Sequence, residues 1–383
     1  MATLRKFTRS LFIVLNGIAV VLFLLACANA FLKPVKWWPI SLLGLIFPLL
    51  LLVVTGFFLF WLFVPSRRPW ALLSFITLVI GWSNIHALLA FHPGARFSDA
   101  KKSPGSLRIL TWNVRSWDEF ITRKPGASGH RSKMMEFIDG KQPDVLCIQE
   151  FYESHNPKEM EDNIAYIRDR LHFPYYFFSR DYRRDDGMYE AGVVIFSRYP
   201  IIDSMSMNYG RPDGIKATES LIAANLNVNG DTIRIYTTHL QSVLFRGKDF
   251  HDLQIIRNVN DSILTASMSI AKKLRYAFRI RAEQAQKVRE QLDSCPYPAV
   301  ICGDFNDVPN SYTYFTIRGS RRDAFIEKGF GIGRTYAYIS PTLRIDYILA
   351  DPRIDVQQCA RFSLPYSDHH PVVADLQLQS KTP

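Results

Sequence analysis

The chain has 383 residues and a formal net charge of +11, from 46 lysines and arginines against 35 acids. Eight of the basic residues and one acid lie within residues 1–100, so the rest of the chain carries a net charge of only +4. So weak an excess argues against a protein that holds nucleic acid chiefly by long-range electrostatic attraction.

Three long stretches without charged residues dominate the start of the chain. Runs of about 18 or more apolar residues are long enough to cross a bilayer as helices. A cleaved signal peptide is the alternative for the first stretch, and Asn84 and His86 interrupt the third. We predict an integral, multi-pass membrane protein whose anchor, residues 1–91, contacts the lipid bilayer through three transmembrane helices, at about 11–32, 40–64 and 70–91.

The basic residues beside these stretches predict an orientation. Arg5, Lys6 and Arg9 precede the first stretch, and basic residues before a first span favour a cytoplasmic N-terminus. Three spans then place the rest of the chain on the extracytoplasmic side. The prediction depends on the third span, because two spans would reverse it.

Beyond the anchor, residues 92–106 are rich in Pro, Gly and Ser and predict a linker. From residue 107 to 383, short apolar runs alternate with helical patterns, which predicts one large domain of mixed α and β structure. Strands are predicted at 107–112, 144–148, 175–178, 192–196, 221–228, 232–237, 299–301, 345–349 and 372–378. Helices are predicted near 133–138, 158–170 and 270–292.

The five cysteines have no metal-binding spacing. Cys147 and Cys302 lie in apolar runs and are predicted core residues, whereas pairing of Cys295 with Cys359 stays open. Nothing in the sequence indicates an obligate protein partner.

Several predicted strands end at polar side chains that suit a divalent cation and a phosphate ester. Asn113, Glu150 and His239 each follow an apolar run, although each alone is also common as a structural strand end. Asp304 and Asn306 are more specific, because two residues apart on an extended segment they lie on one side. Carboxylate oxygens bind Mg²⁺, and a His–Asp pair polarises water or stabilises charge.

The segments that carry these residues occur in a recognisable order: TWN, IQE, GVVIFSRYPI, THL, GDFND, RIDYIL and SDHHPV. Together they resemble the endonuclease/exonuclease/phosphatase superfamily from about residue 107 to 378. The resemblance implies an α/β fold, a two-sheet β-sandwich flanked by helices in four α/β/β/α layers. It also implies an active site at one edge of the sandwich.

The resemblance implies a metal site and its ligands. Glu150 would be the principal ligand of Mg²⁺, with Mn²⁺ as a possible substitute. Asn113 would help to place the metal and a phosphate oxygen, and Asp368 would be a second acid near it.

The resemblance also implies catalytic roles. Asp304 would orient or deprotonate the attacking water, and Asn306 would hold the phosphate. His369 would stabilise the charge of the phosphoryl group, with Asp346 fixing its orientation. His239 matches a phosphate-contacting or general-acid histidine of the deoxyribonuclease and sphingomyelinase branches.

One departure bears on the substrate. Arg115 stands where some apurinic endonucleases of the family carry an acid, which makes a DNA-repair role doubtful. We predict a membrane-anchored, Mg²⁺-dependent phosphoesterase that hydrolyses phosphodiester bonds in a nuclease-like way. Lipid headgroups are the alternative substrate, as for a sphingomyelinase or a phosphoinositide phosphatase. A non-catalytic membrane module is a further alternative, which the complete set of site residues disfavours.

Overall fold

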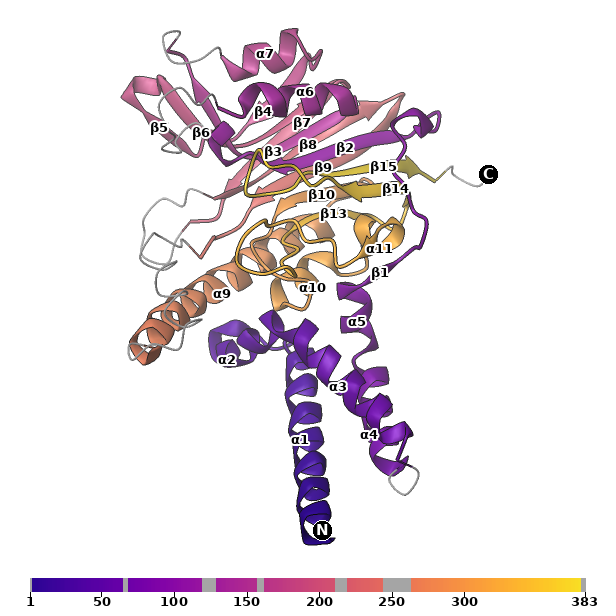
Figure 1. Ribbon diagram of the computed structural model, residues 1–383. Coiled ribbons are helices and arrows are strands. Elements are labelled where there is room, and N and C mark those ends of the chain that lie inside the picture. The colour runs from indigo at the N-terminus through magenta and orange to yellow at the C-terminus, as the bar shows by residue number, and fades with distance from the viewer. Residues whose placement is uncertain are drawn as a thin grey trace. The chain divides into compact units, whose positions relative to one another are not determined.

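A computed structural model describes residues 2–64, 68–118, 129–156, 162–210, 219–243 and 263–379. The chain divides into two compact units (Figure 1). The helical unit comprises residues 1–89, 242–283 and 308–316. The sandwich unit comprises residues 90–241, 284–307 and 317–383.

The helical unit contains α1 (Ala2–Ala28), α2 (Pro34–Leu45), α3 (Phe47–Leu62), α4 (Arg68–Ile80) and α5 (Trp82–Leu88). The long helix α9 (Ile263–Asp293) and the short helix α10 (Tyr312–Arg318) begin in this unit and end in the sandwich unit. Residues Phe7–Ala28 of α1 are long and apolar enough to cross a membrane. This segment corresponds to the first predicted span.

The other two predicted spans, at 40–64 and 70–91, are not single straight helices. The α2 and α3 helices are bent by 61° and α4 and α5 by 63°, so each pair crosses a membrane only if it forms one broken span. Pro48 explains the first break, because it has no N–H to continue the helical hydrogen bonds. Gly81 lies at the second, where a side chain would meet the Phe23 ring at 2.5 Å. Of the three predicted transmembrane helices, only the first is therefore a single helix long and apolar enough to cross a membrane, among the described residues.

Buried amides connect the segments of the helical unit. Asn29 Nδ2 donates to Asn310 O at 2.7 Å, and Asn310 Nδ2 donates to Ala26 O at 2.9 Å. Asn84 Nδ2 donates to Asn310 Oδ1, and Ser41 Oγ donates to Asn29 Oδ1 at 3.0 Å. All four side chains are buried. Asn29, Ser41, Asn84 and Asn310, called the amide cluster below, therefore hold residues 308–316 against the N-terminal helices.

The sandwich unit is built on two sheets. In spatial order, the seven-stranded sheet is formed by β14 (Ile354–Arg361), β15 (Val372–Leu378), β2 (Leu107–Asn113), β3 (Val145–Ser154), β6 (Tyr189–Ser197) and β4 (Tyr175–Phe178), with β5 (Tyr182–Arg184) also paired to β6. The six-stranded sheet is formed by β11 (Arg322–Asp323), β13 (Asp346–Ala350), β10 (Ala299–Asp304), β9 (Asp231–His239), β8 (Ser220–Val228) and β7 (Ile201–Asn208). The pairs β2–β3 and β9–β10 are parallel, and the other pairs are antiparallel.

Two apolar cores follow from the alternation of side chains along the strands. Ile109 of β2 belongs to a core between the sheets, together with Ile235 of β9 and Cys302 of β10. The next residue, Leu110, belongs to a second core with α6 (Arg131–Lys141) and α7 (Asn163–Asp169). Figure 1 shows these helices over the outer face of the seven-stranded sheet. On the six-stranded sheet, Tyr236 Oη donates to Gln291 O of α9, so helices cover both outer faces and the predicted sandwich is confirmed.

Segments that were predicted to be irregular contribute to the sandwich unit. Within the predicted linker, Ser98 N donates to Gln358 Oε1 at 3.0 Å, and the ring of Phe97 packs edge-on against Phe362. Just before it, β1 (Ala90–Phe91) pairs with β12 (Phe330–Gly331). The remaining short elements are α11 (Ala324–Lys328) and the 3-10 turns Asp99–Lys101, Arg115–Asp118 and Asp185–Gly187. Cys295 and Cys359 are both free thiols, so this pairing does not form.

Candidate active site

Strand register brings the predicted site residues to one edge of the sandwich unit. In the six-stranded sheet, Asp304 at the end of β10 lies opposite His239 on one side and Asp346 on the other. In the seven-stranded sheet, Asn113 at the end of β2 lies opposite Gln149 of β3. Parallel strands end at the same edge, so the sequence motifs meet although they are far apart along the chain.

Glu150 owes its position to an irregularity in β3. The register between β3 and β6 shifts between Ile148 and Phe151, and Glu150 has a φ of 50°. Positive φ is uncommon outside glycine, and bulges often redirect a side chain beside an active site. The carboxylate is 38% exposed, and its Oε1 accepts a hydrogen bond from Asn113 Nδ2 at 3.0 Å. It is thus the accessible acid of the site.

Asn113 connects the two sheets. Its Nδ2 donates to Glu150 and also to Asp304 Oδ2 at 3.1 Å. Asp304 is buried, and its Oδ1 accepts the backbone N–H of Asn306 at 2.8 Å. Burial raises the pKa of Asp304 to about 6, although His369 and His239 act in the opposite direction. A carboxyl group of this pKa can accept a proton near neutral pH.

His369 forms a buried pair with Asp346. The Nδ1–H of His369 donates to both carboxylate oxygens of Asp346, at 2.9 and 3.1 Å. Burial opposes the charge of the imidazole, but Asp346, Asp304 and Asp368 outweigh it and raise the pKa of His369 to about 10. The cationic ring then directs Nε2 toward Asp304 Oδ2, 3.6 Å away.

The neighbouring residue His370 behaves in the opposite way. Burial, together with the positive charges of Arg361 and Arg334, lowers the pKa of His370 to about 4. Its Nδ1 accepts the backbone N–H of Leu364 at 3.4 Å. His370 is therefore a neutral structural acceptor, and only the first histidine of the pair faces the acids.

His239 has a buried nitrogen that lacks a hydrogen-bond partner among the described residues. Its Nε2 lies 3.6 Å from Asp304 Oδ2 and 3.8 Å from Glu150 Oε1. Both distances are too long for a hydrogen bond. A buried polar atom without a partner indicates a missing ligand or water at that point.

The loop after β10 requires unusual backbone angles. Gly303 has a φ of 132°, and a side chain there would lie 2.1 Å from Thr238 O. Asn306 has a φ of 53°, and its Nδ2 donates to Leu240 O at 2.9 Å. The side chain of Asn306 is thus held at the loop, and the segment from Asp304 to Asn306 is not extended as the sequence analysis assumed.

Asp368 lies beside a positive charge that the sequence analysis had not placed in the site. Arg115 Nε is 3.4 Å from Asp368 Oδ2. Ser367 Oγ, 3.3 Å from Asp368 Oδ1, also donates to Asn113 O at 2.8 Å. Burial raises the pKa of Asp368, against the effect of His369 and Arg115.

Two further residues of the site were missed. The Tyr336 ring packs edge-on against His369 with 5.1 Å between centroids. Thr335 Oγ1 accepts the backbone N–H of Asp346 at 3.1 Å. Neither lies in a charged motif. The bridge between Tyr336 and His369 and the hydrogen bond from His370 N to Thr335 O at 2.7 Å bring them to the site.

The donor set fits a hard divalent cation. Glu150 offers an accessible carboxylate, and His239 Nε2 lies between two acids without a partner in the described part of the chain. Asn113 presents its amino group to these acids and so orients them. Asp368 is engaged by Arg115, which leaves Glu150 as the group best placed to hold a cation.

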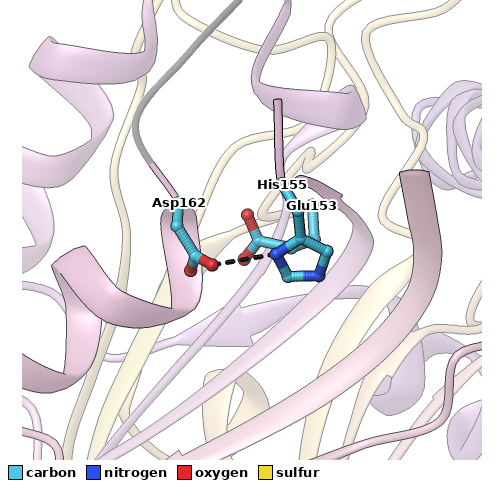
Figure 2. A group of neighbouring side chains, drawn as sticks. All are labelled: Glu153, His155 and Asp162. Atoms are coloured by element: carbon cyan, nitrogen blue, oxygen red, sulfur yellow. Dashed lines mark hydrogen bonds and ion pairs between the residues drawn. The ribbon is translucent and has the colours of Figure 1, made fainter. Parts of the chain in front are cut away.

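A second group with metal-type ligands lies elsewhere in the unit (Figure 2). Glu153 accepts the backbone N–H groups of Asn163 and Ile164, at 2.8 and 2.6 Å. Asp162 accepts the N–H of Ala165 at 2.8 Å and pairs with His155. Both carboxylates therefore satisfy the N-terminus of α7, which explains the cluster without a metal.

Comparisons with known proteins find one similar sequence and several similar folds. Human Protein angel homolog 1 is 24% identical over 213 residues, which cover 55% of this chain and 26%, about a quarter, of that protein. The endonuclease/exonuclease/phosphatase from Beutenbergia cavernae DSM 12333 has a similar fold, with a TM-score of 0.50 at 20% identity over 72% of both chains. The human Nocturnin catalytic domain has a TM-score of 0.49 at 18% identity, over 73% of this chain and 96% of that one.

Family models match both parts of the chain. A model described as a domain of unknown function matches residues 9–88. The model of the Endonuclease/Exonuclease/phosphatase family matches residues 110–369, which is more than half of the chain and includes all eight predicted site residues. The chain therefore belongs to the endonuclease/exonuclease/phosphatase family.

Proposed function

We propose that this protein is a membrane-anchored, divalent-metal-dependent phosphoesterase that hydrolyses phosphodiester bonds. The observation that carries the proposal is the hydrogen-bonded series from Glu150 through Asn113 to Asp304, which meets the His369–Asp346 pair at 3.6 Å. An acid that accepts protons near neutral pH thus lies beside a buried cation. That combination suits the attack of water on a phosphate ester.

A metal, Mg²⁺ or Mn²⁺, would be held by Glu150, with Asn113 and Asp368 near it, and would supply charge neutralisation at the phosphate. The chain's own residues perform the other functions. Asp304 orients the attacking water and accepts its proton as the new P–O bond forms. His369, kept cationic by Asp346, stabilises the negative charge that develops on the phosphoryl oxygens.

Two groups remain for the substrate. His239 Nε2, which lacks a partner in the described structure, is positioned to contact a phosphate oxygen or to protonate the leaving oxygen as its bond to phosphorus breaks. Asn306 holds the phosphate from the loop after β10. His239, Asn306 and Asn113 would thus bind the substrate at the same edge of the sandwich where its hydrolysis takes place.

The substrate class is nucleic acid or a lipid headgroup. The net charge outside the first hundred residues is only +4, so we expect no large positively charged surface that binds a polyanion. A membrane anchor would keep the sandwich unit close to lipid headgroups. The test is a panel on the purified full chain in detergent: bis-p-nitrophenyl phosphate, plasmid DNA, RNA, sphingomyelin and phosphoinositides. Activity on DNA or RNA alone supports the nuclease, and activity on lipids alone supports the alternative. Failure on every substrate with Mg²⁺ and Mn²⁺ contradicts the phosphoesterase and favours a non-catalytic membrane module.

The anchor is proposed to cross the bilayer three times, with α2–α3 and α4–α5 as broken spans. Arg5, Lys6 and Arg9, at the start of α1, favour a cytoplasmic N-terminus, so the sandwich unit is expected outside the cytoplasm. A C-terminal alkaline phosphatase fusion should then be active and a C-terminal green fluorescent protein fusion dark. The opposite pattern would place the sandwich unit in the cytoplasm and contradict this orientation.

A further inference from the structure

Arg115 lies at the candidate active site with part of its side chain open to solvent. Its backbone N–H donates to Asn113 Oδ1 at 3.0 Å, and its Nε lies 3.4 Å from Asp368 Oδ2. The side chain is 40% exposed, whereas that of Asp368 is 16% exposed. An accessible positive charge therefore stands beside the acids of the site.

The backbone that presents Arg115 has an unfavourable conformation. Arg115, Ser116, Trp117 and Asp118 have φ angles of 49°, 50°, 60° and 62°. Consecutive left-handed residues other than glycine are sterically costly and persist only where the surroundings hold them. Trp117 does so here, because it is fully buried and its Nε1 donates to Tyr152 O at 3.0 Å. Strain of this kind is found where a precise placement serves function.

The guanidinium of Arg115 has unused donors. Its terminal amino groups make no hydrogen bond within the described residues, and its Nε forms only a 3.4 Å ion pair. A guanidinium is a rigid fork that matches two oxygens of one phosphate. Asp368 orients this fork through Nε and leaves the terminal groups free to receive an anion.

We propose that Arg115 binds a non-bridging oxygen of the substrate phosphate, and so serves as a substrate-binding cation beside the metal. The inference rests on the proposed phosphoesterase function and adds a residue to it. Asp368 then acts chiefly by positioning Arg115. The competing explanation is that Arg115 only neutralises Asp368 and never touches the substrate.

The experiment compares Arg115→Ala, Arg115→Lys and the matched control Arg168→Ala, in the full chain with saturating Mg²⁺. Arg168 is an exposed arginine paired with Asp169 on α7. Isothermal titration with inorganic phosphate measures affinity without turnover, and initial rates on bis-p-nitrophenyl phosphate give kcat and KM. Thermal unfolding verifies that each variant is folded, and the backbone φ of residue 115 is equally available to Arg, Lys and Ala.

Loss of a charged hydrogen-bond donor should weaken phosphate binding by at least about tenfold in Arg115→Ala. KM should rise by more than kcat falls, Arg115→Lys should recover part of the affinity, and Arg168→Ala should match wild type. Unchanged phosphate affinity in folded Arg115→Ala overturns the inference and leaves the phosphoesterase intact. If the wild-type protein binds phosphate through Arg115 but hydrolyses no substrate, the proposed phosphoesterase function is contradicted and the role of Arg115 in phosphate binding stands.

The double variant Arg115→Ala/Asp368→Asn separates the two explanations. If Arg115 only neutralises Asp368, removing both charges restores phosphate affinity to the wild-type value, and the inference fails. If Arg115 contacts the phosphate, the double variant stays about as weak as Arg115→Ala.

Discussion

Polar groups are buried in both units of this protein, but they are used differently. In the amide cluster of the helical unit, neutral side chains satisfy one another, as when Asn310 donates to Ala26 O and accepts from Asn84. At the edge of the sandwich unit, acids and histidines lie close together. His239 Nε2 has no hydrogen bond among the described residues, and Asp304 has its pKa raised to about 6 chiefly by burial.

The difference separates polar groups that serve stability from those that serve chemistry. A satisfied neutral network specifies one packing and holds its segments together. A crowded and partly unsatisfied charged group is unfavourable in the absence of a ligand and becomes favourable when a cation and an anionic substrate bind. We therefore expect substitutions at the sandwich edge to alter turnover, and substitutions in the amide cluster to alter stability.

The largest effect is expected from the adjacent histidines. His369→Ala should lower kcat by roughly two or more orders of magnitude, since it removes the buried cation that stabilises the phosphoryl charge. His370→Ala is the matched control and should keep kcat near wild type, because His370 is neutral and contacts Leu364. Steady-state rates on bis-p-nitrophenyl phosphate measure both, with thermal unfolding to verify folding. An equal loss of kcat in the two variants would contradict the different roles given to His369 and His370.

Asp346→Asn should have the next largest effect. Loss of the carboxylate that orients a catalytic imidazole costs about tenfold to a hundredfold in activity. The sign of the pH effect follows from the raised pKa of His369, about 10. The cationic form and its contribution are present below that value and lost as pH rises through it. Without Asp346 the pKa falls, so the alkaline limb of the kcat profile should move to lower pH. An unmoved limb would mean that His369 is not the group that titrates.

Asn310→Ala should affect stability and leave chemistry nearly unchanged. The variant removes the acceptor of Asn84 Nδ2 and the donor to Ala26 O, and the loss of these two buried hydrogen bonds costs about 1–3 kcal/mol of unfolding free energy. A lower melting temperature of the full chain in detergent, with kcat close to wild type below that temperature, is the expected result. A large loss of kcat at an unchanged melting temperature would indicate a catalytic role for the amide cluster. It would contradict the distinction between polar groups that serve stability and those that serve chemistry.

Much of the sandwich could be predicted from sequence, because its central strands contain short apolar runs. The prediction for 372–378 matches β15, and that for 299–301 falls within β10. The edge strands β7 and β14 were missed. In β7 (Ile201–Asn208) the apolar repeat is short, because residues 202–204 are all exposed and only Met205 and Met207 alternate with the exposed Ser206 and Asn208.

The site was predictable as far as its residues lie in sequence motifs. Glu150 and Asp304 follow apolar runs and His369 precedes one, and the sheets bring the three residues together. The motif itself could not show that the pKa of His369 is raised and that of His370 lowered, because these shifts depend on burial and on charges from other segments. Asn310 was missed for the same reason, since its partners Asn29 and Asn84 are more than two hundred residues away.

The central claim is tested most directly by the metal dependence of hydrolysis. The full chain, purified and stripped with EDTA, is assayed on bis-p-nitrophenyl phosphate before and after addition of Mg²⁺ or Mn²⁺. Carboxylates crowded at one edge require a cation before an anionic substrate can bind, so EDTA should abolish activity and either metal should restore it. Undiminished hydrolysis in EDTA would contradict the account of the sandwich edge.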